Sequence, residues 1–287
     1  MRASGLHTYT HMQQRTKQVV AITSIVVLMG ILLAQPIKGL VNENNAASET
    51  TTGPQVTFES VSQKAKEGLN PGIIQEIATI EAALQHADDA EKRSLLQQLA
   101  IKWDDVNKSA PLGFIYEDLA ELDGSFDNWL KAGDAYRAAY ANLQDTLTAG
   151  ALNDYAINAY EKALALDSAS LDAKVGLGSA YVTGTANPMA GIALLREVVR
   201  VQPSHVEANK SLGLFSMQSR QFDLAIDRFN TVVSQQPDAE SYFYLATSYE
   251  NIGLNREAIA AFEKSRDLAA DPTLTQFINR KIDELSK

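Results

Sequence analysis

The feature that most constrains the fold of this chain is an internal repeat of 33 residues in its C-terminal half. The segments 222–237 (FDLAIDRFNTVVSQQP) and 256–272 (REAIAAFEKSRDLAADP) align so that Ala225 matches Ala258 and Phe229 matches Phe262. Upstream of these segments, Leu212-Gly213 and Leu245-Ala246 keep the same spacing. A period of this size is typical of stacked units, because a single unit cannot bury its apolar face alone. The alanine-rich composition of the region favours helices within each unit.

Within each unit, the order of small and large residues resembles that of tetratricopeptide (TPR) repeats. That pattern has an aromatic residue, a Leu-Gly/Ala pair and a Tyr on a first helix, then an Ala, an aromatic residue and a second Ala on a second helix, with a closing Pro. Four units between residues 125 and 272 match it. From last to first they supply Tyr242, Leu245, Ala246, Tyr249, Ala258 and Phe262; Leu212, Gly213, Ala225, Phe229 and Pro237; Leu177, Gly178, Tyr181, Gly191, Leu195, Val198 and Pro203; and Trp129, Gly133, Tyr136, Ala156, Tyr160 and Ala163.

The units depart from the pattern at a few places. Ser216 stands where the third unit should have a Tyr, Pro272 comes late, and about eleven extra residues separate the two halves of the first unit. The resemblance implies an all-α, right-handed helical solenoid. Small residues would let the two helices of a unit cross closely, while large ones fill the space between units.

The ends of the repeat domain are less regular. Residues 57–124 have apolar residues at helical spacing, at Ile73, Ile77 and Ile80 and again at Leu96 and Leu99, which predicts three or four helices that form degenerate repeats. Residues 273–287 have the amphipathic pattern of a capping helix at the end of a solenoid.

Helix boundaries can also be predicted. Asn70-Pro71, Asn187-Pro188 and Asp271-Pro272 are expected to be N-caps followed by proline at the first helical position, and Gly124 is expected to end a helix. The segment 204–207 (SHVE) has the spacing of a capping box, with Ser204 as its N-cap.

The N-terminal part of the chain predicts a membrane anchor. Residues 18–37 contain no charged side chain and are long enough, as a helix of about 30 Å, to cross a bilayer. The basic tail 1–17 ends in Arg15 and Lys17, so the positive-inside rule puts it in the cytoplasm. Residues 38–56 are expected to form a flexible tether. The repeat domain would then be periplasmic or extracytoplasmic, on a single-pass protein of the inner (cytoplasmic) membrane. A cleaved signal peptide is the alternative.

Charge and cysteine content exclude several classes of function. Residues 1–40 hold four basic and no acidic residues, which leaves residues 41–287 with 21 basic and 35 acidic ones, a net charge of about −14. Such an acidic domain repels phosphate backbones, so we expect no nucleic-acid partner. The chain has no cysteine, which excludes disulfides, thiolate metal sites and thiol catalysis.

No motif in the sequence predicts catalysis. The four histidines form no metal-binding set, since His86 and His205 are isolated and only His7 and His11 have helical spacing. Phosphate-binding, dinucleotide-binding, nucleophile-elbow and zinc-protease motifs are all missing from the sequence. We therefore expect no enzyme activity, no cofactor, no metal and no small-molecule substrate.

The resemblance also implies where a partner binds. In TPR domains the first helices of successive units line a concave groove, and the positions beside the Leu-Gly pair point into it. Transferred to this chain, the candidate groove residues are Leu130, Arg137, Val182, Lys210, Leu214, Met217, Phe243, Thr247 and Glu250, together with Asp134, Val175 and Ser179. Chaperone-binding TPR domains hold a terminal carboxylate with Lys, Asn and Arg, and that set does not occur here. An extended or helical partner segment with apolar anchors fits better.

These features predict a membrane-anchored scaffold or adaptor that binds a protein or peptide, as an accessory factor in envelope complex assembly, secretion or biogenesis. In its topology the chain resembles bacterial membrane-anchored TPR proteins. Two alternatives belong to other classes. One is a homo-oligomeric structural protein. The other is an enzyme whose site lies in residues 57–124, for which a pocket with converging polar side chains would be the evidence.

Overall fold

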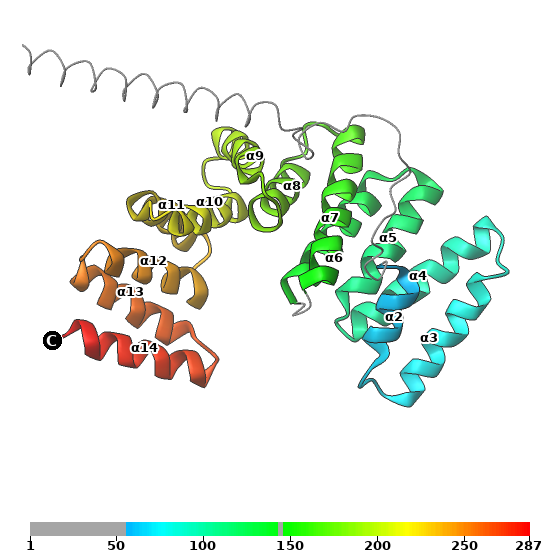
Figure 1. Cartoon of the computed structure of the whole chain (residues 1–287), viewed down its shortest axis with the longest axis horizontal. Helices are drawn as coiled ribbons and strands as arrows, with labels where there is room; N and C mark the ends of the chain where they lie inside the picture. The colour runs from blue at the N-terminus through cyan, green and yellow to red at the C-terminus, as the bar shows by residue number, and fades with distance from the viewer. Residues whose placement is uncertain (1–55, 143–145) are drawn as a thin grey trace, which may run out of the picture. The chain divides into compact units, whose positions relative to one another are not determined.

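The computed structural model describes residues 56–142 and 146–287, and every regular element in these residues is an α-helix (Figure 1). The predicted basic tail, membrane helix and nearly all of the tether lie outside the described residues. None of the helices in the described part combines the length and apolar character that a bilayer span requires. The helices are α2 (Phe58–Lys66), α3 (Pro71–Leu84), α4 (Asp89–Asp105), α5 (Ser109–Asp123), α6 (Phe126–Asn142), α7 (Thr146–Leu166), α8 (Leu171–Gly184), α9 (Pro188–Val201), α10 (Val206–Gln218), α11 (Phe222–Gln235), α12 (Ala239–Asn251), α13 (Asn255–Leu268) and α14 (Pro272–Leu285).

The helices from α8 to α13 pack as three antiparallel pairs that follow one another along the chain (Figure 1). The small residues of the repeat lie where the two helices of a pair cross. A Cβ atom on Gly191 of α9 would come within 2.2 Å of the carbonyl oxygen of Gly178 on α8, so only glycine permits this approach. The ring of Phe229 on α11 lies against Gly213 of α10, where a Cβ atom would crowd it, and Phe229 is fully buried. The spacing of small and large residues therefore produces the predicted close crossing.

The extra residues of the first unit lengthen its helices. Helix α6 has 17 residues and α7 has 21, whereas the helices of the next three units have 13 or 14. The added part of α7 packs on the second unit, since Asn153 is buried and donates through Nδ2 to the carbonyl oxygen of Ala180 at 3.3 Å. The insertion thus extends the contact between the first and second units.

Four helices, α2 to α5, occupy the N-terminal part of the described domain. Their core contains Trp103, Leu96 and Leu99 of α4 and Ile115 of α5, all of them buried. Helix α5 also packs along α6, which joins this core to the first repeat unit. An aromatic cluster packs at this junction. The centre of the Phe114 ring lies 5.1 Å from the ring centres of both Tyr136 and Tyr155.

Most of the predicted helix boundaries agree with the structure. The side chains of Asn70 and Asp271 accept from backbone N–H groups at the starts of α3 and α14, and Gly124 ends α5 in the left-handed conformation at φ 64°. Asn187 is the N-cap residue of α9, but its side chain makes no capping hydrogen bond. The amphipathic helix α14 closes the C-terminal core through the buried Ile278.

The predicted capping box at Ser204 is wrong. The N-cap of α10 is His205, whose Nδ1 accepts from the backbone N–H of Ala208 at 3.4 Å. Because the helix begins one residue later than expected, the third helical position is Ala208, which has no acceptor to complete a box. Glu207 is thereby free to reach across to another helix.

Candidate protein-binding groove

The candidate groove residues lie on the first helices of the four units. Helices α6 and α8, α8 and α10, and α10 and α12 are in contact, so these first helices form one continuous layer. Leu130 and Arg137 lie on α6, Val182 on α8, Lys210, Leu214 and Met217 on α10, and Phe243, Thr247 and Glu250 on α12. The structure therefore brings the residues predicted from the repeat into one layer, although their accessibility differs widely.

Three of the four charged candidates are paired with a residue on another first helix or on the capping helix. Arg137 Nη1 lies 3.1 Å from Glu207 Oε1, Lys210 Nζ lies 2.6 Å from Glu240 Oε2, and Lys281 Nζ lies 2.8 Å from Glu250 Oε1. These partly exposed pairs cross from α6 to α10, from α10 to α12 and from α12 to α14. Pairs of this kind contribute little stability individually, but they hold the surface in one arrangement before a partner arrives.

The partners Glu207, Glu240 and Lys281 are functional candidates that the sequence reasoning missed. A signal for two of them is present in the sequence: Lys210 and Glu240 are 30 residues apart, and Glu250 and Lys281 are 31 apart, both close to one repeat period. Opposite charges at that separation lie on matching faces of consecutive units. The 70-residue separation of Arg137 and Glu207 spans two units.

A polar cluster surrounds Arg137. The hydroxyl of Tyr160, on α7, donates to Asp134 Oδ1 at 2.6 Å, and burial raises the pKa of this tyrosine. Loss of water also raises the pKa of Asp134, although the hydrogen bond from Tyr160 and the charge of Arg137 act in the opposite direction. The Nε of Arg137 is buried and has no hydrogen-bond partner among the described residues. Part of this cluster's hydrogen-bonding capacity is therefore unused.

Two glycines make room for the Tyr160 ring. A Cβ atom on Gly176 of α8 would lie 2.2 Å from Tyr160 Cζ, and one on Gly133 of α6 would lie 2.7 Å from its Cδ1. The ring thus fills the space between α6 and α8, and its hydroxyl reaches the groove side of α6. Gly133 and Gly176 are required for packing and do not form a phosphate loop.

The apolar candidates divide into packing residues and accessible ones. Val182 is only 9% exposed and lies in a buried cluster with Val175 and Ile192. The ring of Phe243 packs 5.7 Å from that of Phe262 and 5.9 Å from that of Phe277, between α12, α13 and α14. Phe243 is nevertheless half-buried, as are Leu130, Leu214 and Met217, and all four keep part of their surface. The accessible apolar surface of these candidates is therefore shared by α6, α10 and α12.

Thr247 is half-buried, and its hydroxyl donates to the carbonyl oxygen of Phe243 at 2.9 Å within α12. Ser179 and Ser211, in contrast, share a hydrogen bond of 2.8 Å between α8 and α10. The first-helix layer is thus tied together by hydroxyl groups as well as by ion pairs.

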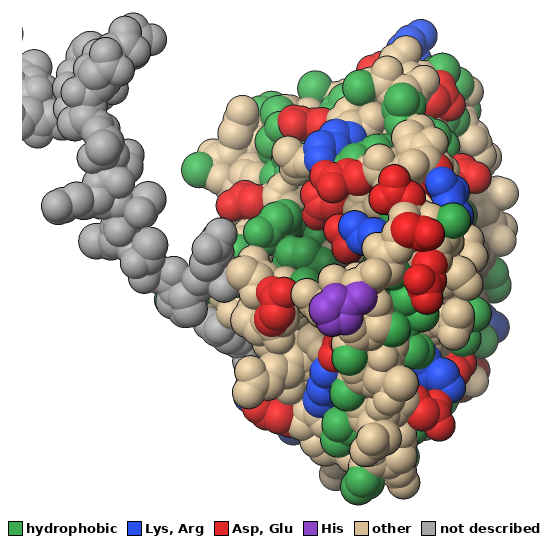
Figure 2. Space-filling view, turned by 90° about the vertical axis from the view of Figure 1, so that its right-hand side faces the viewer, with side chains coloured by type: hydrophobic (Ala, Val, Ile, Leu, Met, Phe, Trp, Pro, Cys, Tyr) green, Lys and Arg blue, Asp and Glu red, His purple; other side chains and the backbone are tan. Residues whose placement is uncertain are grey.

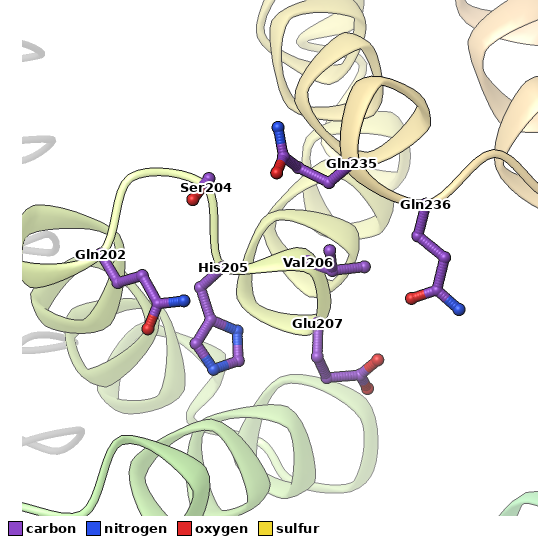
Figure 3. A pocket seen from close by; sticks show the side chains of 7 residues that line it. All are labelled: Gln202, Ser204, His205, Val206, Glu207, Gln235 and Gln236. Carbon is purple, nitrogen blue, oxygen red and sulfur yellow. The ribbon is translucent and has the colours of Figure 1, made fainter.

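A polar depression lies at the start of α10, at one end of this layer (Figure 3). Figure 3 shows His205 and Glu207 extending in a common direction from the start of α10, with the amide side chains of Gln202, Gln235 and Gln236 around them. The Nε2 of His205 lies 3.8 Å from Asp172 Oδ1 on α8. Amides and paired charges of this kind suit hydrogen bonds to a peptide backbone better than a chemical reaction.

A second cleft lies among the N-terminal helices, where an enzyme site was the alternative. Its polar groups include Ser62, Lys66 and Glu81. The hydroxyl of Ser62 is buried and donates to Glu81 Oε1 at 2.6 Å, and Lys66 pairs with the other oxygen of the same carboxylate. This group ties α2 to α3, and the carboxylate that accepts the serine proton is itself paired with Lys66. No set of three His, Cys, Asp or Glu side chains suited to a metal ion occurs in residues 56–142 and 146–287.

Comparison with known proteins supports the repeat assignment. Residues 216–273, from the end of α10 to the start of α14, match the family model described as tetratricopeptide repeat. The structure is similar to a tetratricopeptide repeat protein from Parabacteroides merdae ATCC 43184, with 18% identity, 80% of this chain and 86% of that chain covered, and a TM-score of 0.54. It is also similar to TTC0263, a TPR protein of Thermus thermophilus, with 16% identity, 66% and 98% covered, and a TM-score of 0.50.

A likeness to the MamA protein has 23% identity, coverage of 62% of this chain and 92% of that chain, and a TM-score of 0.47. The sequence matches no curated protein significantly. The resemblance to TPR repeats is therefore confirmed, and the described domain has the fold of TPR proteins. Such repeats generally mediate protein–protein interaction and are typically not catalytic.

Proposed function

We propose that this tetratricopeptide repeat chain is a membrane-anchored scaffold that holds a protein partner in the groove formed by α6, α8, α10 and α12. The observation that carries the proposal is the arrangement of α10 and α12. Leu214 and Met217 of α10 keep apolar surface, and the Lys210–Glu240 and Lys281–Glu250 pairs link α10 to α12 and α12 to α14. An apolar strip on helices that ordered ion pairs link suits an extended or helical segment that inserts apolar side chains.

The anchor is the second part of the proposal. Residues 18–37 would cross the inner membrane, residues 38–56 would form the tether, and the acidic repeat domain would lie on the extracytoplasmic side. The support is the uncharged length of the segment and the basic residues before it. In that position the domain would present its groove to envelope proteins during assembly, secretion or biogenesis.

Partner recovery tests the groove. Pull-down after crosslinking in native membranes should compare the intact chain with Met217→Lys, which places a charge in the apolar strip. We expect recovery of the specific partner to fall by about tenfold, as for loss of an interface anchor. Phe243 is a poor choice for this experiment, because its ring supports the packing of α12, α13 and α14.

Met189→Lys is the matched control, because Met189 is 59% exposed and lies on α9, a second helix. Thermal melts of both variants show whether the fold is kept. Equal loss of partner from the two variants, or no loss from Met217→Lys in a folded protein, would refute groove binding.

The missing cysteines allow a direct test of the anchor. Ser4→Cys and Ser286→Cys give two chains with one thiol each, for labelling of intact cells or spheroplasts with a membrane-impermeant maleimide. We expect the thiol at 286 to react from outside and the thiol at 4 to react only after the membrane is opened. A full-length chain in which both thiols react from outside would contradict the anchored topology.

A further inference from the structure

The N-terminal helices enclose a cleft that the groove does not include. Helix α2 packs on α5, and its Ser62 and Lys66 are tied to Glu81 of α3. The space left between α2, α3, α4 and α5 has a volume of about 790 Å³, which lies in the range of sites that bind ligands.

The cleft exists because α3 presents small side chains to it. Ala78 and Ala82 line the space and stay exposed, and Ile77 is the only residue of α3 that is fully buried. Opposite them, Phe58 of α2, Leu96 of α4 and Phe114 of α5 provide apolar walls. Regular repeat units fill such a space with a large side chain, and this part of the chain leaves it open.

One carboxylate in the cleft has no direct partner within the described part of the chain, although Lys92 also lines the cleft and its charge acts on this carboxylate. Asp118 of α5 lines the cleft, and no hydrogen bond or ion pair joins it to another described residue. Burial raises the pKa of this carboxyl; the positive charge of Lys92 lowers it without forming an ion pair, and Glu121 and Glu117 raise it further. Two other carboxylates line the cleft: the half-buried Glu81, which is already paired with Lys66, and the exposed Glu59. Asp118 is therefore the acceptor that a bound cation would satisfy.

We propose that this cleft binds a short segment of a partner protein that carries a lysine or arginine among apolar side chains. The positive group would pair with Asp118, and the aliphatic stem and its apolar neighbours would lie against Phe58, Leu96 and Phe114. The volume exceeds what a single basic side chain needs, so neighbouring residues of the same segment also fit. On the side of the molecule formed by these helices, Figure 2 shows hydrophobic side chains among acidic ones, with Lys and Arg side chains interspersed.

This site goes beyond the groove and is independent of it. A scaffold with two sites of different chemistry can hold two segments of one partner, or two partners, at the same time. Binding through both sites would strengthen a weak interaction at either one.

The test uses the full chain in lipid nanodiscs with labelled methyl groups and the peptide Ac-LFKLA-NH2 as the probe. We expect titration to shift the methyl signals of Leu96 and Ile115, which line the cleft. Asp118→Asn should raise the Kd by at least about tenfold, because a charge-assisted contact is lost. The peptide Ac-LFELA-NH2 should bind the unchanged protein more weakly by a similar factor.

Two further variants test whether binding of the peptide depends on Asp118 and on the open cleft. Asp105→Asn removes an exposed carboxylate at the end of α4, outside the cleft lining, and should leave the Kd unchanged. Ala82→Leu fills the cleft and should abolish the shifts while a circular dichroism melt shows an intact fold. If Leu96 and Ile115 do not shift, if the shifts fall only on α10 and α12, or if folded Asp118→Asn binds as tightly as the unchanged protein, the proposal is overturned.

Discussion

The two ends of the described domain use the same kind of helix but fill the space between helices in different ways. From α8 to α13, glycine and alanine lie at the crossings and a large side chain from the next helix fills each gap, as Phe229 does beside Gly213. From α2 to α5, the core is built around Trp103, and the small residues of α3 lie beside an open cleft. The regular units thus fill their crossings with large side chains, whereas the N-terminal helices leave a cleft beside Asp118.

The largest effect should come from removing a side chain that fills a repeat unit. Phe229→Ala deletes a fully buried ring from the core of α10 to α12, and we expect it to lower the free energy of unfolding by about 3–5 kcal/mol. Chemical denaturation measures the loss. Leu224→Ala, on the same helix but 48% exposed, is the control and should cost no more than about 0.5 kcal/mol. Similar losses for the two variants would contradict the packing described here.

Replacing an alanine by leucine should show directly that the two regions differ in how closely they are packed. Ala225→Leu inserts three carbons into a fully buried crossing and should cost about 1–3 kcal/mol. Ala82→Leu makes the same change beside the open cleft and should alter stability by no more than about 0.5 kcal/mol. Equal destabilisation of the two variants in a thermal melt would show that the cleft is as closely packed as the repeats.

Two glycine replacements provide a second matched pair, in which one variant should destabilise the domain and the other should stabilise it. Gly176→Ala improves helix propensity but pushes a methyl group into the ring of Tyr160, so we expect a net loss of about 1–2 kcal/mol. Gly150→Ala lies in α7, where a Cβ atom would meet nothing within 4 Å, and should stabilise the domain by about 0.5–1 kcal/mol. A stabilising Gly176→Ala would mean that α6, α7 and α8 are not held as closely as described.

The smallest effect should come from the charge in the cleft, and it depends on pH. The pKa of Asp118 is raised in the folded protein, so ionisation costs more there than in the unfolded chain. Below the unfolded value of about 4, both states are protonated and the cost vanishes; it develops as the pH rises through the raised pKa. Relative to the unchanged protein, Asp118→Asn should therefore become more stabilising from pH 4 to pH 7, as measured by melts at each pH. A constant difference would show that Asp118 is not destabilised by burial.

The regular part of the fold could be predicted because spacing alone determines it. The 33-residue period, together with Asn70, Gly124 and Asp271, predicted the pairs from α8 to α13 and the ends of α3, α5 and α14. The greater length of the helices in the first unit could not be predicted, because about eleven inserted residues can either extend helices or form a loop. The structure shows that the insertion lengthens α6 and α7.

The groove was predictable in outline and not in detail. Repeat position predicted that the candidates lie on the first helices of the units, but their burial depends on what the neighbouring helix presents. For this reason Val182 is buried, while Phe243, Leu214 and Met217 pack against the core and keep part of their surface. The cleft beside Asp118 arises between separate helices, which no local pattern records, and the N-cap at His205 lies one residue after the predicted one.

The account depends most on the groove face of α10 as the surface that meets a partner. The most direct measurement replaces Met217 with the photo-crosslinking residue benzoylphenylalanine in the full chain and irradiates native membranes. Met189, on α9, is replaced in the same way for comparison. The account predicts a specific crosslinked protein from position 217 and none from position 189. Crosslinks from 189 alone, or from both positions equally, would contradict it.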